Sequence, residues 1–398
     1  MTGLADIRDA AALLQGVTDR TPVQLSRALS RVVGAEVWLK CENLQRTGSF
    51  KLRGAYVRMA RLSAQEQSRG VVAASAGNHA QGVALAAQML GIESVVFMPV
   101  DAALPKVAAT RDYGARVEAV GASVDEALRH AHEYAERTGA VLIHPFDHED
   151  VVAGQGTIAL EIAEQVPDVA TVLVPVGGGG LAAGVVAALA ELRPSVRVIG
   201  VQAEGAAAYP PSMAEGHPVP AGAMHTMADG IAVGLPGTVP FDILLRHAIP
   251  VRTVSEEDLS RALLLVAERA KMLVEPSGAA AVASLMAEPG GLEGPVVAIL
   301  SGGNIDPLVL LRVVRHGLAS AGRFLHLRVR LDDTPGALAE LLRDLAATGA
   351  NVMEVSHART AVELAVDEVA IELQVETKGP DHCAHVVQTL TTAGYRLT

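Results

Sequence analysis

The chain has 398 residues, of which 50% are hydrophobic and only 3% aromatic, and its formal net charge is −12. This length predicts two or three folding units, whose cores must be filled mainly by Ala, Val and Leu. Because the chain is acidic and contains no basic block, we expect neither nucleic acid nor an anionic membrane surface as a partner.

Three sequence features bear on the cellular compartment. The cysteines Cys41 and Cys383 lie far apart without a CxxC motif, which predicts a reducing compartment and no disulfide framework. Charged residues from Asp6 onward precede any apolar run, unlike a signal peptide. The segment 169–190 has no charged residue, but a proline and the glycines Gly177–Gly180 interrupt it, so a strand, a turn and a buried helix explain it better than a membrane span. We therefore expect a cytoplasmic protein.

The first motif along the chain is the segment 47–55, with the sequence TGSFKLRGA. It follows an apolar, strand-like run at 37–40 and a polar loop, and it opens a predicted helix with Ser49 as the N-cap. Lys51 would then lie in the first helical turn, where the helix dipole disfavours an ammonium group and lowers the pKa of the amine. This indicates a lysine suited to amine chemistry, although an ordinary solvated lysine is the alternative when Lys51 is taken alone.

Two further polar motifs lie near predicted helix starts. The hydroxyl, amide and N–H groups of segment 75–82 suit a carboxylate and a ring oxygen, although a simple N-cap would need only Ser75 or Asn78. The segment 154–157, with the sequence GQGT, is either a substrate loop or another helix start.

Short β-branched runs alternate with Ala-rich helical stretches over most of the chain. This alternation predicts an α/β fold of two doubly wound, mostly parallel open sheets, with ligands bound beyond the carboxyl ends of the strands. The predicted strands are 71–74, 94–98, 115–120, 141–144, 171–176, 197–202 and 296–300, and the predicted helices lie near 78–90, 106–113, 123–137 and 156–166.

The glycines Gly177–Gly180 and Leu181 follow the predicted strand 171–176. Glycines at a strand-to-helix turn let backbone N–H groups point together at an anion, so this motif predicts a phosphate cradle. It is neither GxGxxG nor a P-loop, which argues against NAD and ATP. A tight turn without a ligand is the alternative, and Gly180 and Gly184 are more simply explained by close helix packing.

The last polar turn, Ser301–Asn304, follows another predicted buried strand. The hydroxyl of Ser301 suits a ring nitrogen of a ligand, and an ordinary turn without a ligand is the alternative. Beyond it, the small residues of 317–322 predict a flexible linker. We therefore expect a larger part at 1–316, with a smaller subdomain at about 42–146, a linker at 317–323 and a separate module at 324–398. The βαββαβ order of that module predicts an α+β ferredoxin-like fold.

The motifs SFKLRGA, SAGNHAQG, AGQGT, GGGGL and SGGN occur in this order, and with them the chain resembles the threonine dehydratases (threonine ammonia-lyases) over nearly its whole length. These are pyridoxal-phosphate enzymes built like the tryptophan synthase β subunit, fold type II, here with a C-terminal ACT-type regulatory domain. The resemblance implies pyridoxal 5'-phosphate as cofactor and Lys51 as the residue covalently joined to it. It implies cofactor binding by Lys51, Phe50, Asn78, Gly177, Gly178, Gly179, Gly180, Leu181, Glu275 and Ser301, and substrate binding by Ser75, Ala76, Gly77 and His79.

The activity that the resemblance implies is β-elimination of L-threonine to 2-oxobutanoate and ammonia, and of L-serine to pyruvate, with Lys51 taking the Cα proton. An L-serine dehydratase, a serine racemase-like enzyme and a non-catalytic amino-acid sensor are the alternatives. Ala76 stands where racemases of this family carry a second serine, which favours a lyase. Glu204 matches one cation ligand of eukaryotic-type relatives, but Pro210 replaces the other, so we expect no metal.

The C-terminal module resembles an ACT domain, which implies a homodimer or homotetramer and an allosteric amino acid such as isoleucine or valine. A module that only assembles subunits is the alternative. The sequence leaves open whether the enzyme serves isoleucine biosynthesis or threonine breakdown. The expected regulatory residues are Asp333, Thr334, Pro335, Gly336, Ala337, Leu338, Asn351 and Val352.

Overall fold

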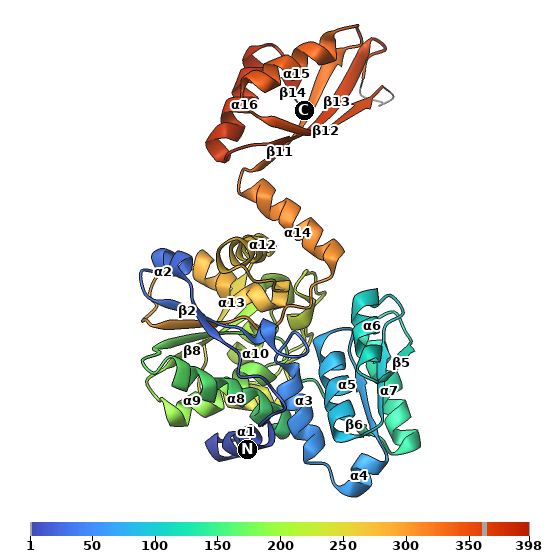
Figure 1. Ribbon diagram of the computed structural model, residues 1–398, viewed down its shortest axis with the longest axis vertical. Helices are drawn as coiled ribbons and strands as arrows, with labels where there is room; N and C mark the ends of the chain where they lie inside the picture. Colours follow the sequence, from blue (N-terminus) through green and yellow to red (C-terminus); the bar gives the residue numbers. More distant parts are fainter. Residues whose placement is uncertain (1, 360–363, 398) are drawn as a thin grey trace. The chain divides into compact units, whose positions relative to one another are not determined.

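The computed structural model describes residues 2–359 and 364–397 and divides the chain into two compact units, Met1–Leu310 and Leu311–Thr398 (Figure 1). Within these described ranges, no helix has both the length and the apolar content that crossing a membrane requires.

The larger sheet of the first unit has the strand order β1-β2-β10-β7-β8-β9. Only β1 runs antiparallel to its neighbour, and the other pairs are parallel. Buried strands such as β7 and β10 are almost wholly apolar, as expected of a parallel sheet covered on both faces. The strands are β1 Val23–Leu25, β2 Val37–Lys40, β7 Thr171–Pro175, β8 Arg197–Ala203, β9 Val251–Val254 and β10 Val296–Ile299.

Helices cover both faces of this sheet (Figure 1). Helices α8 and α9 pack together on one face, and α13 packs on the other against β7, β8, β9 and β10. The helices of this group are α1 Leu4–Leu13, α2 Arg27–Val33, α8 Glu149–Gln165, α9 Gly180–Leu192, α10 Tyr209–Glu215, α11 Thr238–Arg246, α12 Glu256–Leu265 and α13 Pro276–Ala287, with short helical turns η1 Glu42–Leu44, η2 Glu204–Ala206, η3 Asp229–Ile231 and η4 Val266–Ala270.

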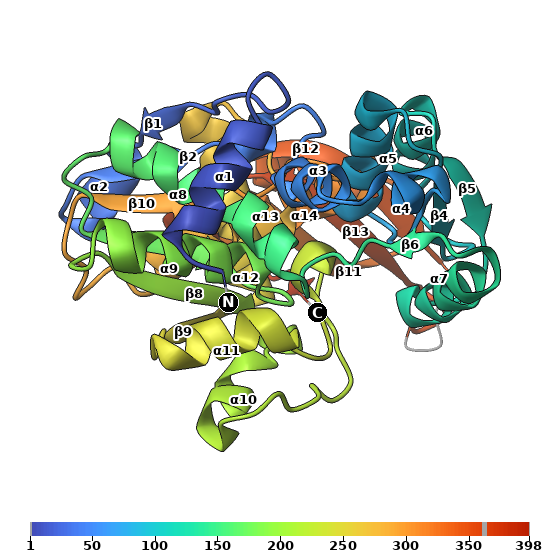
Figure 2. The ribbon, with the colours of Figure 1, turned by 90° about the horizontal axis from the view of Figure 1, so that it is seen from below.

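The smaller sheet has the order β5-β4-β3-β6, and all its pairs are parallel. Its strands and helices form a separate group beside the larger sheet (Figure 2). The two sheets confirm the predicted α/β class with mostly parallel strands. The elements of this group are α3 Lys51–Ala60, α4 Ala64–Ser68, β3 Val71–Ala74, α5 Asn78–Leu90, β4 Ser94–Met98, α6 Leu104–Asp112, β5 Arg116–Ala119, α7 Val124–Thr138 and β6 Val141–Leu142.

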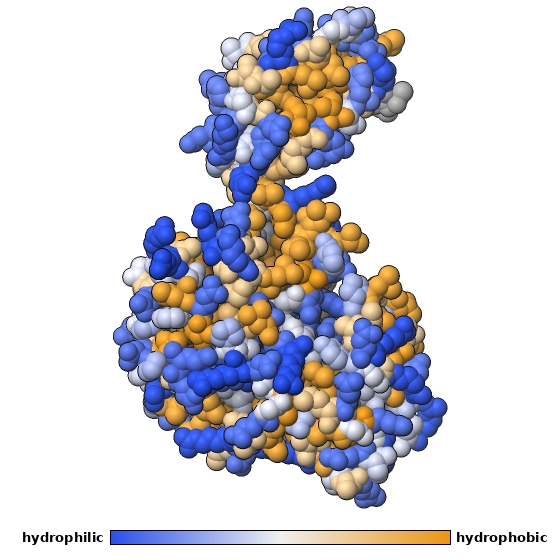
Figure 3. Space-filling view, in the orientation of Figure 1, coloured by the Kyte–Doolittle hydropathy of each residue, from blue (hydrophilic) through white to orange (hydrophobic). Residues whose placement is uncertain are grey.

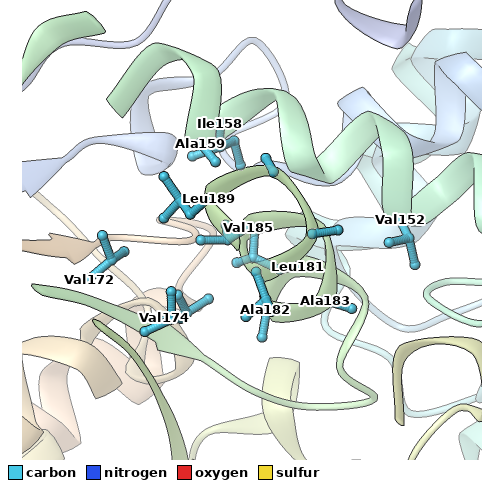
Figure 4. Packing of buried hydrophobic residues seen from close by; sticks show 14 of the residues in the cluster. Val152, Ile158, Ala159, Val172, Val174, Leu181, Ala182, Ala183, Val185 and Leu189 are labelled. Carbon is cyan, nitrogen blue, oxygen red and sulfur yellow. The ribbon is translucent and has the colours of Figure 1, made fainter. Parts of the chain in front are cut away.

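The core of the first unit lies between α8, α9 and β7, where small and branched apolar side chains interdigitate (Figure 4). Glycines let the helix backbones approach closely. A Cβ at Gly154 would lie 2.6 Å from the carbonyl oxygen of Arg53 in α3, and one at Gly156 would lie 2.8 Å from that of Gly184 in α9. At these two glycines, α8 therefore packs directly against the backbones of α3 and α9.

This packing corrects the sequence-based prediction for the segment 154–157. The segment is neither a substrate loop nor a helix start but the interior of α8, which begins at Glu149, well before the predicted start at 156. The two glycines resemble loop residues in the sequence because their packing partners, Arg53 and Gly184, are distant along the chain.

The second unit contains an antiparallel sheet of order β12-β13-β11-β14 with a core of its own. Its βαββαβ order agrees with the predicted ferredoxin-like topology. Apolar side chains also gather on one exposed face of this unit (Figure 3). Its elements are β11 Phe324–Asp332, α15 Ala337–Ala347, β12 Asn351–Ala358, β13 Glu368–Glu376, α16 Pro380–Thr392 and β14 Arg396–Leu397.

The prediction of a flexible linker from residue 317 was wrong for its first four residues, 317–320. Helix α14, Pro307–Ser320, continues through them, and Gly317 is buried. A glycine inside a helix costs only about 1 kcal/mol relative to alanine, so one glycine does not end a helix of this length.

Candidate active site

The loop that precedes α3 is fastened to the loop that follows β10. Ser49 and Gly302 form an isolated β-bridge, and the N–H of Phe50 donates to the carbonyl oxygen of Ser301 at 3.2 Å. The N–H of Gly303 donates to the carbonyl oxygen of Gly48 at 2.8 Å. These bonds hold the start of α3 beside the carboxyl end of β10, where parallel sheets bind ligands.

The predicted N-cap role of Ser49 was wrong. Phe50 is the N-cap residue of α3, and the Ser49 hydroxyl, fully buried, has no hydrogen-bond partner among the described residues. The bridge to Gly302 draws Ser49 into extended pairing with a distant segment, which local sequence does not reveal.

Lys51 is the first residue of α3 and is half-buried. Its Nζ donates to the carbonyl oxygen of Pro145 at 3.1 Å and lies 5.1 Å from the centre of the Phe50 ring. Burial lowers the pKa of the Lys51 amine to about 8, although the charge of Glu275 acts in the opposite direction. The direction of the shift agrees with the prediction, and its largest cause is loss of hydration. A larger neutral fraction makes the amine a better nucleophile and base near neutral pH.

The glycines Gly177–Gly180 form the turn between β7 and α9. Gly179 has φ +99°, a conformation that favours glycine, and it is the N-cap of α9. Its missing Cβ leaves room for the hydroxyl of Tyr209, which donates to the carbonyl oxygen of Gly178 at 3.1 Å. A Cβ at Gly178 would overlap the ring of Phe146. The first N–H groups of a helix lack intrahelical partners, so this turn is a close-packed cradle that fits a phosphate.

Asn78 and Glu275 meet next to the loop after β10. The Asn78 Nδ2 donates to the Glu275 Oε1 at 2.5 Å, and a Cβ at Gly302 would meet both side chains. Glu275 is only 2% exposed, and burial, reinforced by the charge of Asp229, raises the pKa of its carboxyl to about 7. The structure thus brings together Lys51, Asn78, Glu275 and the Ser301 loop, as the sequence predicts.

The segment 75–79 after β3, which is expected to bind the substrate, offers backbone groups for binding more than side chains. The N–H of Gly77 donates to the Ser75 hydroxyl at 3.1 Å, and Ala76 is half-buried. The His79 Nε2 lies 2.7 Å from the carbonyl oxygen of Ile143. Burial, with the nearby charge of Lys51, lowers the pKa of His79 to about 3, so the ring is neutral and its Nε2–H donates to that carbonyl. His79 therefore anchors the loop rather than offering a free donor.

An ion pair that the sequence analysis missed joins the two sheet groups beside this loop. The Lys106 Nζ, on α6, lies 2.7 Å from the Asp229 Oδ2, on η3. Burial alone would lower the pKa of Lys106, but Asp229 raises it, so the ammonium group is retained. The same Nζ would lie 3.7 Å from a Cβ at Gly77. Neither residue stands in a recognisable motif, so no sequence signal pairs them.

A buried ion-pair network, formed by Lys40, Glu42, Arg53 and Glu161, fixes the rest of α3. Arg53 is 1% exposed and lies 2.8 Å from Glu42 and 2.6 Å from Glu161. The Lys40 Nζ lies 2.5 Å from the Glu161 Oε2 and donates to the carbonyl oxygen of Thr21 at 2.8 Å. Arg53 stands two residues after Lys51, so the network holds the helical turn that carries the amine.

No group of three or more His, Cys, Asp or Glu residues in the described ranges is arranged to hold a metal ion.

The two mostly parallel sheets, the half-buried Lys51 amine and the tetraglycine cradle together fit an α/β enzyme that holds a phosphorylated cofactor beside a lysine. Residues 14–302 match the model of a family described as pyridoxal-phosphate dependent enzyme. The L-threonine ammonia-lyase of Thermotoga maritima is 45% identical over 397 residues, which cover 100% of this chain and 99% of that protein.

Solved structures give the same result. The processed form of threonine deaminase isoform 2 from Solanum lycopersicum has a TM-score of 0.76 at 38% identity and covers 79% of this chain and 90% of its own. Maize serine racemase has a TM-score of 0.75 at 33% identity and covers 80% of this chain and 98% of its own. The chain belongs to the family of pyridoxal-phosphate dependent enzymes, which confirms the predicted family resemblance and the predicted cofactor.

The lowered pKa of Lys51 predicts how the apo-protein takes up pyridoxal phosphate. Since only the neutral amine is a nucleophile, the visible absorbance of the joined cofactor should develop at a rate that is half-maximal near pH 8. Glu275→Gln should lower this midpoint, because the carboxylate of Glu275 raises the pKa of Lys51. Stopped-flow absorbance across pH checks both. A midpoint near the ordinary lysine value of about 10.4 would contradict the assignment.

Proposed function

We propose that the protein catalyses the pyridoxal-phosphate-dependent deamination of L-threonine to 2-oxobutanoate and ammonia, and that it also converts L-serine to pyruvate. The observation that carries this proposal is the half-buried Lys51 amine, which has a pKa lowered to about 8, lies 5.1 Å from the centre of the Phe50 ring and belongs to a helix whose start is bonded to the loop after β10. The full-length similarity to an L-threonine ammonia-lyase supports the substrate.

The residues around Lys51 suit each part of the cofactor. The Lys51 amine would hold the aldehyde carbon, and the turn Gly177–Gly180 with Leu181 would hold the phosphate. Asn78 would meet the ring hydroxyl, Ser301 the pyridine nitrogen, and Glu275 would lie near the ring. When bound, pyridoxal phosphate supplies an electron sink for the charge that develops at the substrate Cα.

The protein then supplies binding and proton transfer. The backbone at Ser75, Ala76 and Gly77, at the start of α5, would bind the substrate carboxylate, with His79 holding this segment to Ile143. The Lys51 amine would take the Cα proton, a role that suits its lowered pKa. The β-hydroxyl leaves as water, and hydrolysis of the remaining enamine consumes one water and gives 2-oxobutanoate and ammonia.

Serine racemisation is the second candidate, because maize serine racemase has a similar structure. Racemisation requires a group that returns a proton to the opposite face of Cα. Ala76 has no acidic or basic atom for this step, which favours elimination over racemisation.

Replacing Lys51 tests this function most simply. Lys51→Ala should abolish the visible absorbance of the bound cofactor and lower 2-oxobutanoate formation from threonine by about 10²–10⁴-fold or more, because the nucleophile and the base are lost together. Lys378→Ala, an exposed lysine of the second unit, is the matched control and should retain both properties. Comparing kcat/KM for threonine and serine settles the preference. A wild type without cofactor absorbance or 2-oxoacid formation would support a non-catalytic sensor.

We further infer that the second unit is an ACT-type domain that binds isoleucine or valine and adjusts catalysis. A cavity of about 360 Å³ in this unit supports this. It is lined by the loop Asp333–Leu338 and by apolar residues such as Val369 and Ile371, and Arg359 and Asp333 form an ion pair at 3.1 Å. An apolar wall beside a paired cation and carboxylate suits a branched-chain amino acid. Asn351 and Val352, also expected to be regulatory, lie outside the lining of this cavity.

We also propose a homodimer or homotetramer that works in the cytoplasm. The edge strand β12 exposes Met353 and Val355, at 60% and 39%, which suits pairing with a second copy. The free thiols of Cys41 and Cys383 suit a reducing compartment.

Effector titration tests the regulatory proposal on the intact enzyme. Isoleucine or valine should change the threonine concentration that gives half-maximal rate by about 5-fold or more, the usual scale of allosteric coupling. Arg359→Gln should remove this response, because it breaks the pair at the cavity, whereas Arg343→Gln, on the exposed side of α15, should not. If neither amino acid changes this threonine concentration in the intact enzyme, the second unit would have only a role in subunit assembly.

A further inference from the structure

Asn304, which the function above does not use, joins three segments of the active site. It lies in the loop after β10, the same loop that contains Ser301. Its Nδ2 donates to the carbonyl oxygen of Thr47 at 2.7 Å and to the Oδ1 of Asn78 at 2.8 Å. Thr47 begins the segment that leads into Lys51, and Asn78 begins α5. One amide group thus connects the lysine loop, the Asn78 helix and the Ser301 loop.

These two bonds determine which way the Asn78 amide faces. The carbonyl oxygen of Thr47 can only accept, so Asn304 must turn its NH₂ group toward it. The second hydrogen of that NH₂ group needs an acceptor, so Asn78 must turn its Oδ1 toward Asn304. The Nδ2 of Asn78 is then aimed at the Glu275 carboxyl, 2.5 Å away. A flipped Asn78 would set its oxygen against the ionised carboxylate of Glu275 and its NH₂ group against the NH₂ group of Asn304.

The backbone next to Lys51 leaves room for Asn304. Gly48 has φ +69°, and a Cβ at Gly48 would overlap the Asn304 side chain, coming within 2.9 Å of its Cγ. The N–H of Gly303 donates to the carbonyl oxygen of Gly48 at 2.8 Å, which fixes the two loops against each other. The absence of a side chain at Gly48 therefore allows the Asn304 amide to reach both of its acceptors.

We propose that Asn304 is a positioning residue that fixes the Asn78 amide in the orientation in which Asn78 meets the cofactor ring. The proposal rests on the proposed function, in which Asn78 contacts the ring hydroxyl of pyridoxal phosphate. Asn304 itself touches neither the substrate nor the reacting atoms in this account. It acts by holding Asn78 and by tying the Lys51 loop to the Ser301 loop.

Asn304→Asp is the most informative variant, because a carboxylate keeps the shape of the amide but cannot donate. It would repel the carbonyl oxygen of Thr47 and the Oδ1 of Asn78 and so favour the flipped Asn78. Asn304→Ala removes both bonds without this repulsion and should have a smaller effect. Gly48→Ala should act like Asn304→Ala, because it displaces the same side chain. Gln388→Glu, which makes the same amide-to-carboxylate change at an exposed position of α16, is the matched control.

The readouts are the dissociation constant of pyridoxal phosphate from the apo-protein, the pH dependence of the visible band of the bound cofactor, and kcat and KM for threonine. In Asn304→Asp the cofactor should bind about tenfold more weakly, the scale of one lost hydrogen bond, and the pH transition of the band should shift. The kcat should fall more than KM rises, since Asn78 contacts the cofactor and not the substrate. Gln388→Glu should match wild type in all three.

The outcomes separate this inference from the proposed function. A wild type that binds no pyridoxal phosphate would overturn the proposed function. A wild type that binds it, with Asn304→Asp showing the same dissociation constant and the same pH transition, would overturn the role of Asn304 alone. If Asn304→Asp does not fold, as judged by circular dichroism, the same comparison is made with Asn304→Ala and Gly48→Ala, and wild-type values in both would overturn it.

Discussion

The position of the Lys51 amine depends on the buried ion-pair network around Arg53. Arg53 and Glu42 are 1% and 0% exposed, and a single unpaired charge at such depth would be strongly unfavourable. Burial alone would raise the pKa of Glu42, but Arg53 holds it below its usual range, so the carboxylate stays charged. Because Arg53 and Lys51 share the first turns of α3, pairing the guanidinium with Glu42 and Glu161 also sets where the amine lies.

Close helix packing completes this platform. Gly154 allows α8 to contact the backbone of Arg53, and Gly156 meets Gly184 of α9, the helix that begins at the tetraglycine turn. The Lys51 amine on α3 and the proposed phosphate cradle before α9 are therefore attached to opposite sides of one helix, α8. A rigid separation between these groups is what a cofactor held at both its aldehyde and its phosphate requires.

Much of this could be predicted from the sequence where the signal is local. Apolar runs between Ala-rich helices predict parallel sheets, and the turn Gly177–Gly180 is recognisable because the left-handed Gly179 and the close contacts of its neighbours require a run of glycines. The rest depends on contacts between distant residues. In the sequence Ser49 has the pattern of an N-cap, but in the structure it pairs with Gly302. Gly154 has the pattern of a loop glycine, but it lies in a helix that packs against Arg53. Nothing near Lys106 in the sequence indicates its pairing with Asp229.

The central claim is that one amine among the lysines of this chain is joined to pyridoxal phosphate. Borohydride reduction of the cofactor-loaded protein followed by peptide mass spectrometry tests it directly, because reduction makes the bond permanent. The account predicts that the pyridoxyl label is found on Lys51 and not on the other lysines, Lys40, Lys106, Lys271 and Lys378. A label on Lys106, which faces the same loop from α6, or no label on any lysine, would contradict it.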